Sequence, residues 1–199
     1  MTEKTLLRQE KINARDSLTA EERLERSNEI CRRILEDAAY RNAKTVMIYK
    51  AVRGEARLDL LETVNAASPE PKRFVYPLCL THGRMLAVEP GSPDTDGPAW
   101  KKGSFGIPAP DPDRGRVIPP EEIDYVICPC TAFDDENRRL GMGGGYYDRF
   151  LPLCKNAVIT AAAFEIQRAA SVPSDDLDQP VNKVFTCLMC QEPPAKTAQ

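Results

Sequence analysis

The sequence contains one histidine, one tryptophan and only 7% aromatic residues, and no apolar run approaches the length of a membrane span. Its 27 basic and 30 acidic residues leave a net charge of −3, and no block of one sign stands out. Proteins that bind nucleic acid or an anionic membrane usually carry a basic patch. We therefore expect neither partner, and a small molecule is the better default.

The cysteines number seven, which is an odd count for a disulfide framework. The first residues enter a charged helical pattern directly, so we expect no leader segment, a cytoplasmic location and reduced thiols. Cys128 and Cys130 together with Cys187 and Cys190 could in principle form a zinc site. The first pair has the wrong spacing for a zinc knuckle and lies in an apolar run, which favours buried thiols.

At 199 residues and 42% hydrophobic content, the chain is long enough for one domain with a substantial core. We expect a single domain over residues 1–199, with a disordered tail from about residue 192. Helical patterns cover residues 4–16 and the segment that follows a capping box formed by Thr19 and Glu22. The predicted apolar stripe of this second helix consists of Leu24, Cys31, Ile34, Leu35 and Ala38.

Short apolar runs of strand length alternate with helical patterns along the rest of the chain. A helix is predicted over 58–66, and strands are predicted over 45–49, 73–76, 85–88, 124–129, 157–161 and 184–188. The turn at 81–84 joins two of these strands as a hairpin. Most of the 17 prolines lie between Pro69 and Pro120, which predicts a loop-rich middle. Continuous apolar strands are typical of a largely parallel sheet covered on both faces.

Residues 139–151 read R-L-G-M-G-G-G-Y-Y-D-R-F-L and lie between two predicted strands. Glycines allow backbone N–H groups to point inward, and a following helix start adds partial positive charge, so the segment is suited to bind phosphate. It lacks the Lys-Ser/Thr pair of a P-loop and does not fit the dinucleotide fingerprint. Taken alone, the glycine cluster would be more typical of a flexible turn than of a phosphate site.

The flanking residues make the pattern more specific, because residues 139–148 resemble the signature of the 5-formyltetrahydrofolate cyclo-ligase family. Further similar segments are Lys4-x-x-x-Arg8, 18–23, 49–55, 106–110 and 132–134. The resemblance thus spans nearly the whole chain. It implies a three-layer α/β/α fold with a largely parallel central sheet, shared with sugar-phosphate isomerases and CoA transferases.

The resemblance also implies an activity, the ATP- and Mg²⁺-dependent cyclisation of 5-formyltetrahydrofolate to 5,10-methenyltetrahydrofolate through a phosphorylated formyl group. The substrate would carry a polyglutamate tail or none, and the protein would be a monomer. Arg139 and Tyr147 are the implied catalytic residues, and Asp148 is the implied Mg²⁺ ligand. The implied ATP site consists of Lys4, Arg8, Arg139, Gly141, Met142, Gly143, Gly144, Gly145, Tyr146 and Tyr147. The implied folate site consists of Lys50, Glu55, Gly144, Gly145, Tyr146 and Tyr147.

Elementary chemistry is compatible with these roles, although each residue type also has a structural explanation. Lys4 and Arg8 are four apart and share a helix face that could reach a triphosphate or could simply be solvated. Asp148 could instead be a first-turn helix acid. Tyr146 could pack in the core, whereas the Glu55 carboxylate is well shaped to accept hydrogen bonds from pterin N–H groups.

One position departs from the family pattern. Near the C-terminus the family often has an aspartate that helps to hold the metal, and the nearest match here is Asn182, a ligand without charge. His82 lies in a predicted turn and is not expected to be catalytic. Two other functions remain open at this point, a non-catalytic relative that binds folate or nucleotide and another small-molecule enzyme on the same fold.

Overall fold

The computed structural model describes residues 2–103 and 106–187. The described α-helices are α1 (Glu3–Asp16), α2 (Ala20–Glu36), α3 (Ala38–Asn42), α4 (Asp59–Ala66) and α5 (Tyr146–Phe150). The described strands are β1 (Thr45–Met47), β2 (Arg73–Cys79), β3 (Met85–Glu89), β4 (Trp100–Lys102), β5 (Pro108–Pro110), β6 (Arg116–Ile118), β7 (Tyr125–Pro129), β8 (Ala132–Phe133), β9 (Arg139–Leu140), β10 (Val158–Ala162) and β11 (Lys183–Phe185). Short 3₁₀ helices at 81–83, 120–122, 151–153 and 165–167 lie between them.

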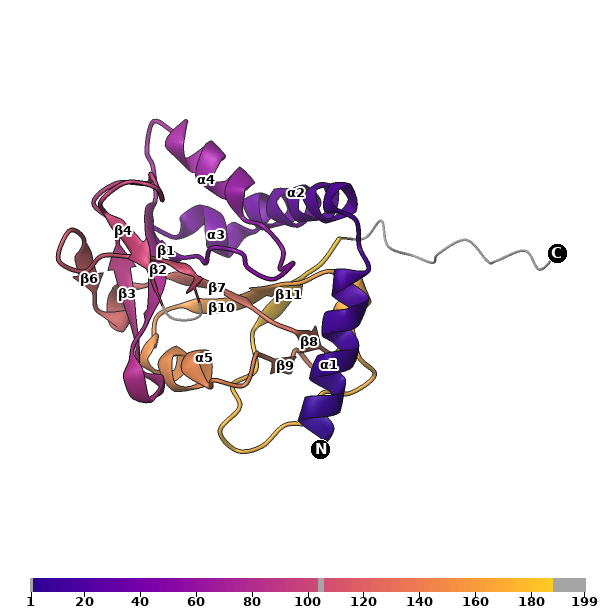
Figure 1. Cartoon of the computed structure of the whole chain (residues 1–199). Helices are drawn as coiled ribbons and strands as arrows, with labels where there is room; N and C mark the ends of the chain where they lie inside the picture. Colours follow the sequence, from indigo (N-terminus) through magenta and orange to yellow (C-terminus); the bar gives the residue numbers. More distant parts are fainter. Residues whose placement is uncertain (1, 104–105, 188–199) are drawn as a thin grey trace.

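A seven-stranded sheet in the order β11-β10-β7-β1-β2-β3-β6 forms the centre of the molecule (Figure 1). The pairs from β11 to β2 are parallel, whereas β2 with β3 and β3 with β6 are antiparallel. The predicted hairpin is therefore confirmed, with β2 and β3 joined by the 3₁₀ turn at Thr81–Gly83. The prediction of an α/β fold with a largely parallel sheet is also confirmed.

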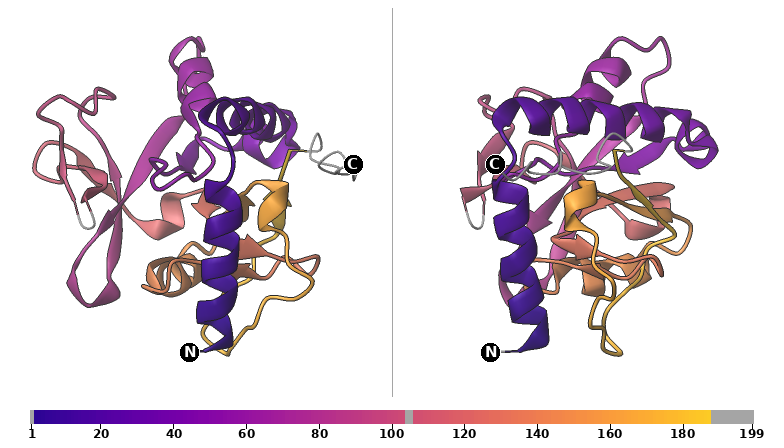
Figure 2. Two further views of the ribbon diagram at one scale, coloured as in Figure 1. Left: turned by 45° about the vertical axis from the view of Figure 1, so that its right-hand side comes forward. Right: turned by 90° about the vertical axis from the view of Figure 1, so that its right-hand side faces the viewer.

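Helices cover both faces of this sheet, as the views in Figures 1 and 2 show. Alternate residues of β1 and of its extension point to opposite faces. Val46 and Ile48 belong to the same core cluster as Ile34 of α2, whereas Met47 packs in a second cluster with Phe150 of α5. The β1 segment is buried on both sides, which explains its continuous apolar run and the three-layer arrangement.

The capping box predicted at the start of α2 is present. Thr19 Oγ1 accepts a hydrogen bond from Glu22 N at 3.1 Å, and Thr19 N donates to Glu22 Oε2 at 2.8 Å. The predicted apolar stripe is only partly correct, because Leu24 is 48% exposed and Ala38 is exposed beyond the helix end. Asp37 ends α2 and caps α3 by accepting from Ala39 N and Tyr40 N, so Ala38 no longer shares the buried face of α2.

The proline-rich middle contains more strand than we predicted. β4 pairs antiparallel with β5, and Trp100 lies opposite Pro110 while Lys102 lies opposite Pro108. A two-stranded ribbon has an outer edge for each strand, and proline is tolerated where its missing N–H would face that edge. The middle is loop-rich as predicted, but its proline content did not reveal this short ribbon.

The predicted buried thiols are confirmed for Cys128, Cys130 and Cys187, while Cys190 and the tail from about residue 192 lie outside the described residues.

Within 2–103 and 106–187, no helix combines the length and apolar character that crossing a membrane requires.

Candidate functional site

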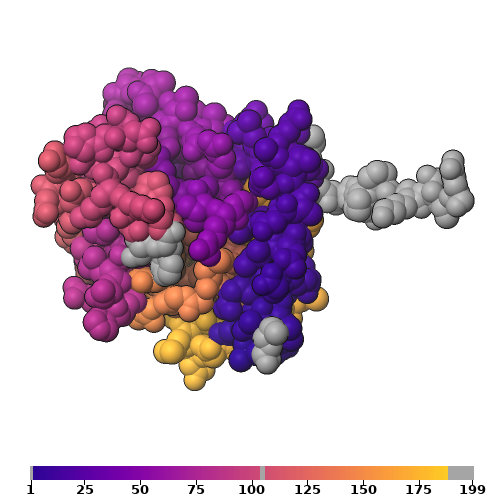
Figure 3. All heavy atoms as spheres, in the orientation of Figure 1, coloured from indigo at the N-terminus to yellow at the C-terminus, as the bar shows by residue number. Residues whose placement is uncertain are grey.

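A cavity of about 700 Å³ opens beside the ends of the parallel strands β1 and β7. In the space-filling view, a hollow lies among the indigo N-terminal segment, the magenta segments and the orange segment (Figure 3). Open α/β sheets bind ligands outside the carboxyl ends of their strands. The cavity walls come from α1, the loop after β1, strands β2 and β5, the end of β7, β9 with the glycine segment, α5, and the loop at 175–178.

The glycine segment Gly141–Gly145 forms one wall and is held from two sides. Arg8 Nε of α1 donates to the Gly141 carbonyl at 2.7 Å, and Arg149 donates to the Gly144 carbonyl and, at 3.0 Å, to the Gly83 carbonyl. Gly145 has φ +63°, and a Cβ there would lie 2.7 Å from Arg149 Nη1. Only glycine fits this position without displacing the arginine.

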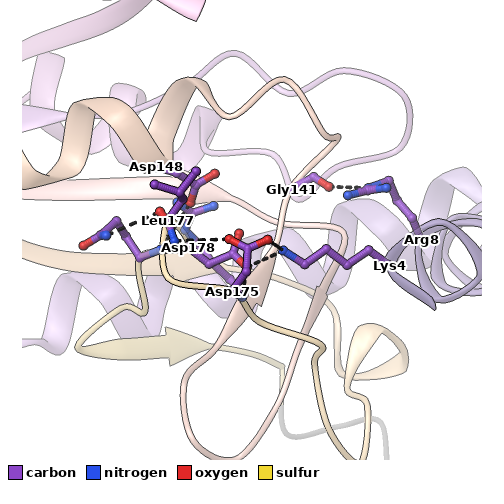
Figure 4. Close-up of polar contacts among 9 residues, drawn as sticks. Lys4, Arg8, Gly141, Asp148, Asp175, Leu177 and Asp178 are labelled. Carbon is purple, nitrogen blue, oxygen red and sulfur yellow. Dashed lines mark hydrogen bonds and ion pairs between the residues drawn. The ribbon is translucent and has the colours of Figure 1, made fainter. Parts of the chain in front are cut away.

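Cations and carboxylates alternate along the wall between α1 and the 175–178 loop (Figure 4). Lys4 Nζ donates to Asp175 at 2.7 Å and also to Asp178. Burial opposes the charge on Lys4, but the hydrogen bonds to these two carboxylates outweigh it and raise the pKa of Lys4. The backbone N–H of Gln179 lies 3.4 Å from Asp148 Oδ1, so the loop brings Asp178 close to Asp148.

Arg139 is the buried cation of the site, with its side chain 2% exposed. Its Nη2 donates to Asp148 Oδ1 at 2.7 Å, and its guanidinium carbon lies 5.8 Å from the Tyr147 ring centroid. The Tyr147 hydroxyl is buried and has no hydrogen-bond partner among the described residues. Burial raises the pKa of Tyr147 well above its usual value, so the hydroxyl remains a neutral donor next to the cavity.

Glu55 lies on the opposite wall, in the loop that follows β1. Its Oε2 accepts a hydrogen bond from Val52 N at 3.0 Å. Burial raises the pKa of Glu55, while that hydrogen bond and the charges of Arg15 and Arg53 act in the other direction. A partly desolvated carboxylate beside a cavity is a strong hydrogen-bond acceptor for a ligand.

The raised pKa of Glu55 predicts a measurable effect on stability. Below the ordinary value of 4.5, the carboxyl is protonated in both folded and unfolded chains, so its burial carries no charge penalty. As pH rises through the folded-state pKa, burying the ionised form opposes folding. Glu55→Gln should therefore match the wild-type Tm at about pH 4 and exceed it at about pH 8, by about 3 °C for each kcal/mol relieved.

Thermal unfolding at both pH values tests this, with Glu165→Gln as a control in the 3₁₀ helix 165–167, where the substitution removes an ion pair with Arg168 and no gain at the higher pH is expected. A Tm of Glu55→Gln at or below the wild-type value at the higher pH would contradict the prediction.

An aromatic corner lies where β2 meets the cavity, with Tyr76 in the lining and Trp100 of β4 outside it, packed against the Tyr76 ring. The rings of Tyr76 and Trp100 lie 4.9 Å apart at 72°, and Lys50 Nζ lies 5.3 Å from the Tyr76 centroid and 5.5 Å from that of Trp100. Glu62 Oε1 accepts a hydrogen bond from Lys50 at 2.5 Å and another from the Tyr76 hydroxyl. The corner offers flat apolar surface with one cation, which suits a ring-bearing ligand.

The structure brings together all but one of the residues that the sequence singled out for the site. The lining includes Lys4, Arg8, Lys50, Glu55, Arg139, Gly141, Met142, Gly143, Gly144, Gly145, Tyr146, Tyr147 and Asp148. Asn182 is the exception. Its side-chain Oδ1 accepts a hydrogen bond from Ile159 N at 2.8 Å, and its backbone N–H donates one to the Ile159 carbonyl at 2.8 Å. These bonds join the starts of β10 and β11, so the structure gives Asn182 a role in the sheet and does not place it in the cavity.

Sequence analysis missed the carboxylates of the loop at 175–178. Asp175 and Asp178 line the cavity, and the acidic run D-D-L-D was the signal that could have identified them. The family pattern pointed instead to Asn182, four residues after Asp178. His82 lies outside the cavity lining, in the predicted hairpin turn, with φ 58°.

Comparison with known proteins gives a consistent result. The sequence model of the 5-formyltetrahydrofolate cyclo-ligase family matches residues 1–187. The 5-formyltetrahydrofolate cyclo-ligase of Haemophilus influenzae is 28% identical over 179 residues, covering 88% of this chain and 92% of that protein. The protein of the same name from Escherichia coli K12 is 27% identical over 176 residues, covering 86% and 93%.

Solved structures agree in fold. The 5,10-methenyltetrahydrofolate synthetase of Aquifex aeolicus superimposes with a TM-score of 0.78 at 29% identity, covering 93% of this chain and 90% of that one. The synthetase of Mycoplasma pneumoniae gives a TM-score of 0.73 at 20% identity, covering 93% and 99%, and supports the fold alone.

Proposed function

Because this chain belongs to the 5-formyltetrahydrofolate cyclo-ligase family, we propose that it converts 5-formyltetrahydrofolate to 5,10-methenyltetrahydrofolate at the expense of ATP. The family match over residues 1–187 supports this proposal, as does the near full-length similarity to the H. influenzae and E. coli proteins. The remaining support comes from the geometry of the cavity.

The observation that carries the proposal is that one cavity has two chemically different walls. The glycine segment, Lys4 and Arg8 form a wall suited to phosphates, and Glu55 with the aromatic corner forms a wall suited to a pterin and an aryl ring. A volume of about 700 Å³ lies within the range of ligand pockets. A ligase must hold both substrates against each other, so a shared cavity is what the reaction requires.

At the nucleotide wall, we assign Lys4, Arg8 and Arg139 to the phosphates of ATP. Lys4 and Arg8 come from one face of α1, and Arg139 comes from β9 on the far side of the glycine segment. Cations on both sides can stabilise charge that spreads over the transferring phosphoryl group. Arg139 is the most buried of the three, so its charge is screened least by water.

The carboxylates on this wall fit a magnesium ion. Mg²⁺ is usually held by one or two carboxylates together with substrate phosphates and water. Asp148 and Asp178 are the two side chains that we propose for this role, with Asp178 replacing Asn182 as the second candidate. In the described residues these carboxylates are paired with Arg139 and Lys4. When bound, the ion would neutralise phosphate charge, and its coordination by the two carboxylates would free both cations to contact the nucleotide.

The chemistry proceeds in two balanced steps. The formyl oxygen attacks the γ-phosphorus of ATP, and the bond from phosphorus to the ADP oxygen breaks. N10 then attacks the formyl carbon and loses its proton, and the carbon–oxygen bond breaks with release of inorganic phosphate. Phosphorylation converts a poor leaving group into a good one, so the protein mainly positions the three reacting groups (formyl, N10 and γ-phosphoryl) and stabilises charge.

At the folate wall, the Glu55 carboxylate would accept hydrogen bonds from the pterin N–H groups. The Tyr147 hydroxyl has no partner among the described residues and lies on the wall between the two ligands. We propose that it donates a hydrogen bond to the substrate close to the reacting formyl group. A buried hydroxyl with an unmet hydrogen bond gains most when the ligand supplies the acceptor.

Turnover with purified protein tests the proposal. Incubation with 5-formyltetrahydrofolate and Mg-ATP should produce the near-ultraviolet absorbance of 5,10-methenyltetrahydrofolate and an equal amount of ADP, and neither product should form without ATP. A folded protein that binds both ligands and forms neither product would contradict the enzymatic proposal and would indicate a non-catalytic binding protein.

A further inference from the structure

Arg15 is a fully buried arginine outside the cavity lining. It lies in the last turn of α1 with 1% of its surface exposed. A guanidinium is seldom buried unless its hydrogen bonds and charge are matched. Here Nη2 donates to the Arg53 carbonyl at 2.5 Å, while Nε and Nη1 have no hydrogen-bond partner among the described residues. A burial this unfavourable calls for an explanation beyond packing.

Arg15 contacts the sharp turn at Arg53 and Gly54. Arg53 and Gly54 both have positive φ, at 49° and 79°, so the chain reverses sharply just before Glu55. Glu55 N donates to the Val52 carbonyl at 3.0 Å, which closes the turn. A non-glycine residue in this conformation is disfavoured by itself, and the bond from Arg15 to the Arg53 carbonyl holds it in place.

Packing fixes the turn from the same side. A Cβ on Gly54 would lie 3.6 Å from Arg15 Nε and 3.1 Å from Asp16 Oδ1. The guanidinium therefore packs directly against the turn and leaves it little room to shift. Its positive charge also favours the ionised form of Glu55, in opposition to the effect of burial on the pKa of that carboxyl. Geometry and charge thus act on the same residue.

The helix that carries Arg15 also carries the nucleotide-wall cations. Lys4 and Arg15 are eleven positions apart on α1, which corresponds to roughly 16 Å along the helix axis. Arg8, near the middle of α1, contacts the glycine segment, and Arg15, in the last turn, contacts the Glu55 turn. α1 therefore connects the two walls of the cavity as a single rigid element.

We propose that Arg15 is a positioning residue for folate binding, which holds the Arg53–Gly54 turn so that the Glu55 carboxylate faces the substrate. The proposal rests on the assignment of Glu55 to the folate wall. It predicts that loss of Arg15 weakens the use of 5-formyltetrahydrofolate much more than the use of ATP, because the contacts of Lys4 and Arg8 come from turns of α1 that the substitution does not touch.

A double-mutant cycle tests this with Arg15→Met, Glu55→Gln and the combined variant. Arg15→Met should raise KM for 5-formyltetrahydrofolate by about tenfold or more and leave KM for Mg-ATP within about twofold. In the Glu55→Gln background the same substitution should have less than about a threefold effect, because its target is already changed. Arg15→Lys, which keeps the charge, should recover part of the loss.

Arg23→Met is the matched control. Arg23 also donates to a backbone carbonyl at 2.5 Å, that of Leu18, and it approaches the same glycine, since its Cδ would lie 3.9 Å from a Gly54 Cβ. The charges that lower the pKa of Glu55 are those of Arg15 and Arg53, not that of Arg23. Arg23→Met should leave both KM values near wild type.

Three results would overturn the inference: an unchanged folate KM in Arg15→Met, an equal effect in both backgrounds, or an equal effect of Arg23→Met. If Arg15→Met does not fold, Arg15→Lys and Arg15→Gln carry the same test, and a wild-type folate KM in both would overturn the inference. The proposed function fails separately, if the wild-type protein forms no product. A wild-type folate KM in Glu55→Gln would remove both the folate role of Glu55 and the inference.

Discussion

Arg139→Met should lower kcat by about 10²- to 10³-fold while the protein remains folded. Arg139 is held rigidly by its 2.7 Å bond to Asp148 and by the Tyr147 ring, and its side chain is 2% exposed. Once Mg²⁺ has taken Asp148, this buried cation beside the Tyr147 ring would stabilise developing phosphoryl charge with little screening by water. Asp148 is 21% exposed and can be solvated when its partner is lost, so the loss of stability should be smaller than the ~3–5 kcal/mol for a fully buried pair.

Steady-state kinetics and a thermal melt check this expectation, with Arg168→Met as the control. Arg168 also pairs with carboxylates and lies 4.8 Å from an aromatic centroid, that of Phe133, but it does not line the cavity. Its replacement should leave kcat near wild type. An Arg139→Met protein that turns over within about threefold of wild type would show that Arg139 has no part in the charge stabilisation.

Asp148→Asn and Asp178→Asn should each raise the Mg²⁺ concentration for half-maximal rate by about tenfold or more. Both substitutions keep the size of the side chain and remove the charge that favours Mg²⁺. Each also removes an ion-pair partner of Arg139 or Lys4, so KM for ATP is not a clean readout. The dependence of the rate on Mg²⁺ at saturating ATP is the measurement that isolates the metal.

Two control substitutions give this experiment its resolution. Asp176→Asn changes an exposed acid in the same loop outside the cavity lining, and it should leave the Mg²⁺ dependence unchanged. Asn182→Asp adds a carboxylate where the family pattern suggested one, and it should also have no effect, because the Asn182 side chain bonds to Ile159. A lower Mg²⁺ requirement in Asn182→Asp would restore Asn182 as the ligand position and contradict the assignment of Asp178.

The sequence was informative where function and local physics coincide. The strands β7 and β10 were recognisable because both faces of the sheet are covered, which requires a continuous apolar run. The glycine segment was recognisable because positive φ at Gly143 and Gly145 favours glycine. The i, i+4 spacing of Lys4 and Arg8 gave their common helix face, though the resemblance was needed to indicate that this face meets a ligand.

Features that depend on tertiary contacts could not be predicted from the sequence. Arg15 reads as one more charged residue of an amphipathic helix, and only the fold buries it beneath the Glu55 turn. The 175–178 loop has no helical or strand periodicity. Its carboxylates Asp175 and Asp178 lie at the cavity because they accept hydrogen bonds from Lys4 of α1. The sequence could not decide the role of Asn182, because an amide oxygen suits a metal and a backbone N–H equally well.

The proposed mechanism requires that the formyl oxygen is phosphorylated and leaves as phosphate. It is tested most directly with 5-formyltetrahydrofolate that carries ¹⁸O in the formyl group, turned over with unlabelled Mg-ATP in unlabelled water. Phosphate recovered from the reaction should contain the label, one ¹⁸O for each 5,10-methenyltetrahydrofolate formed. Unlabelled phosphate, with the ¹⁸O lost to water, would contradict the account.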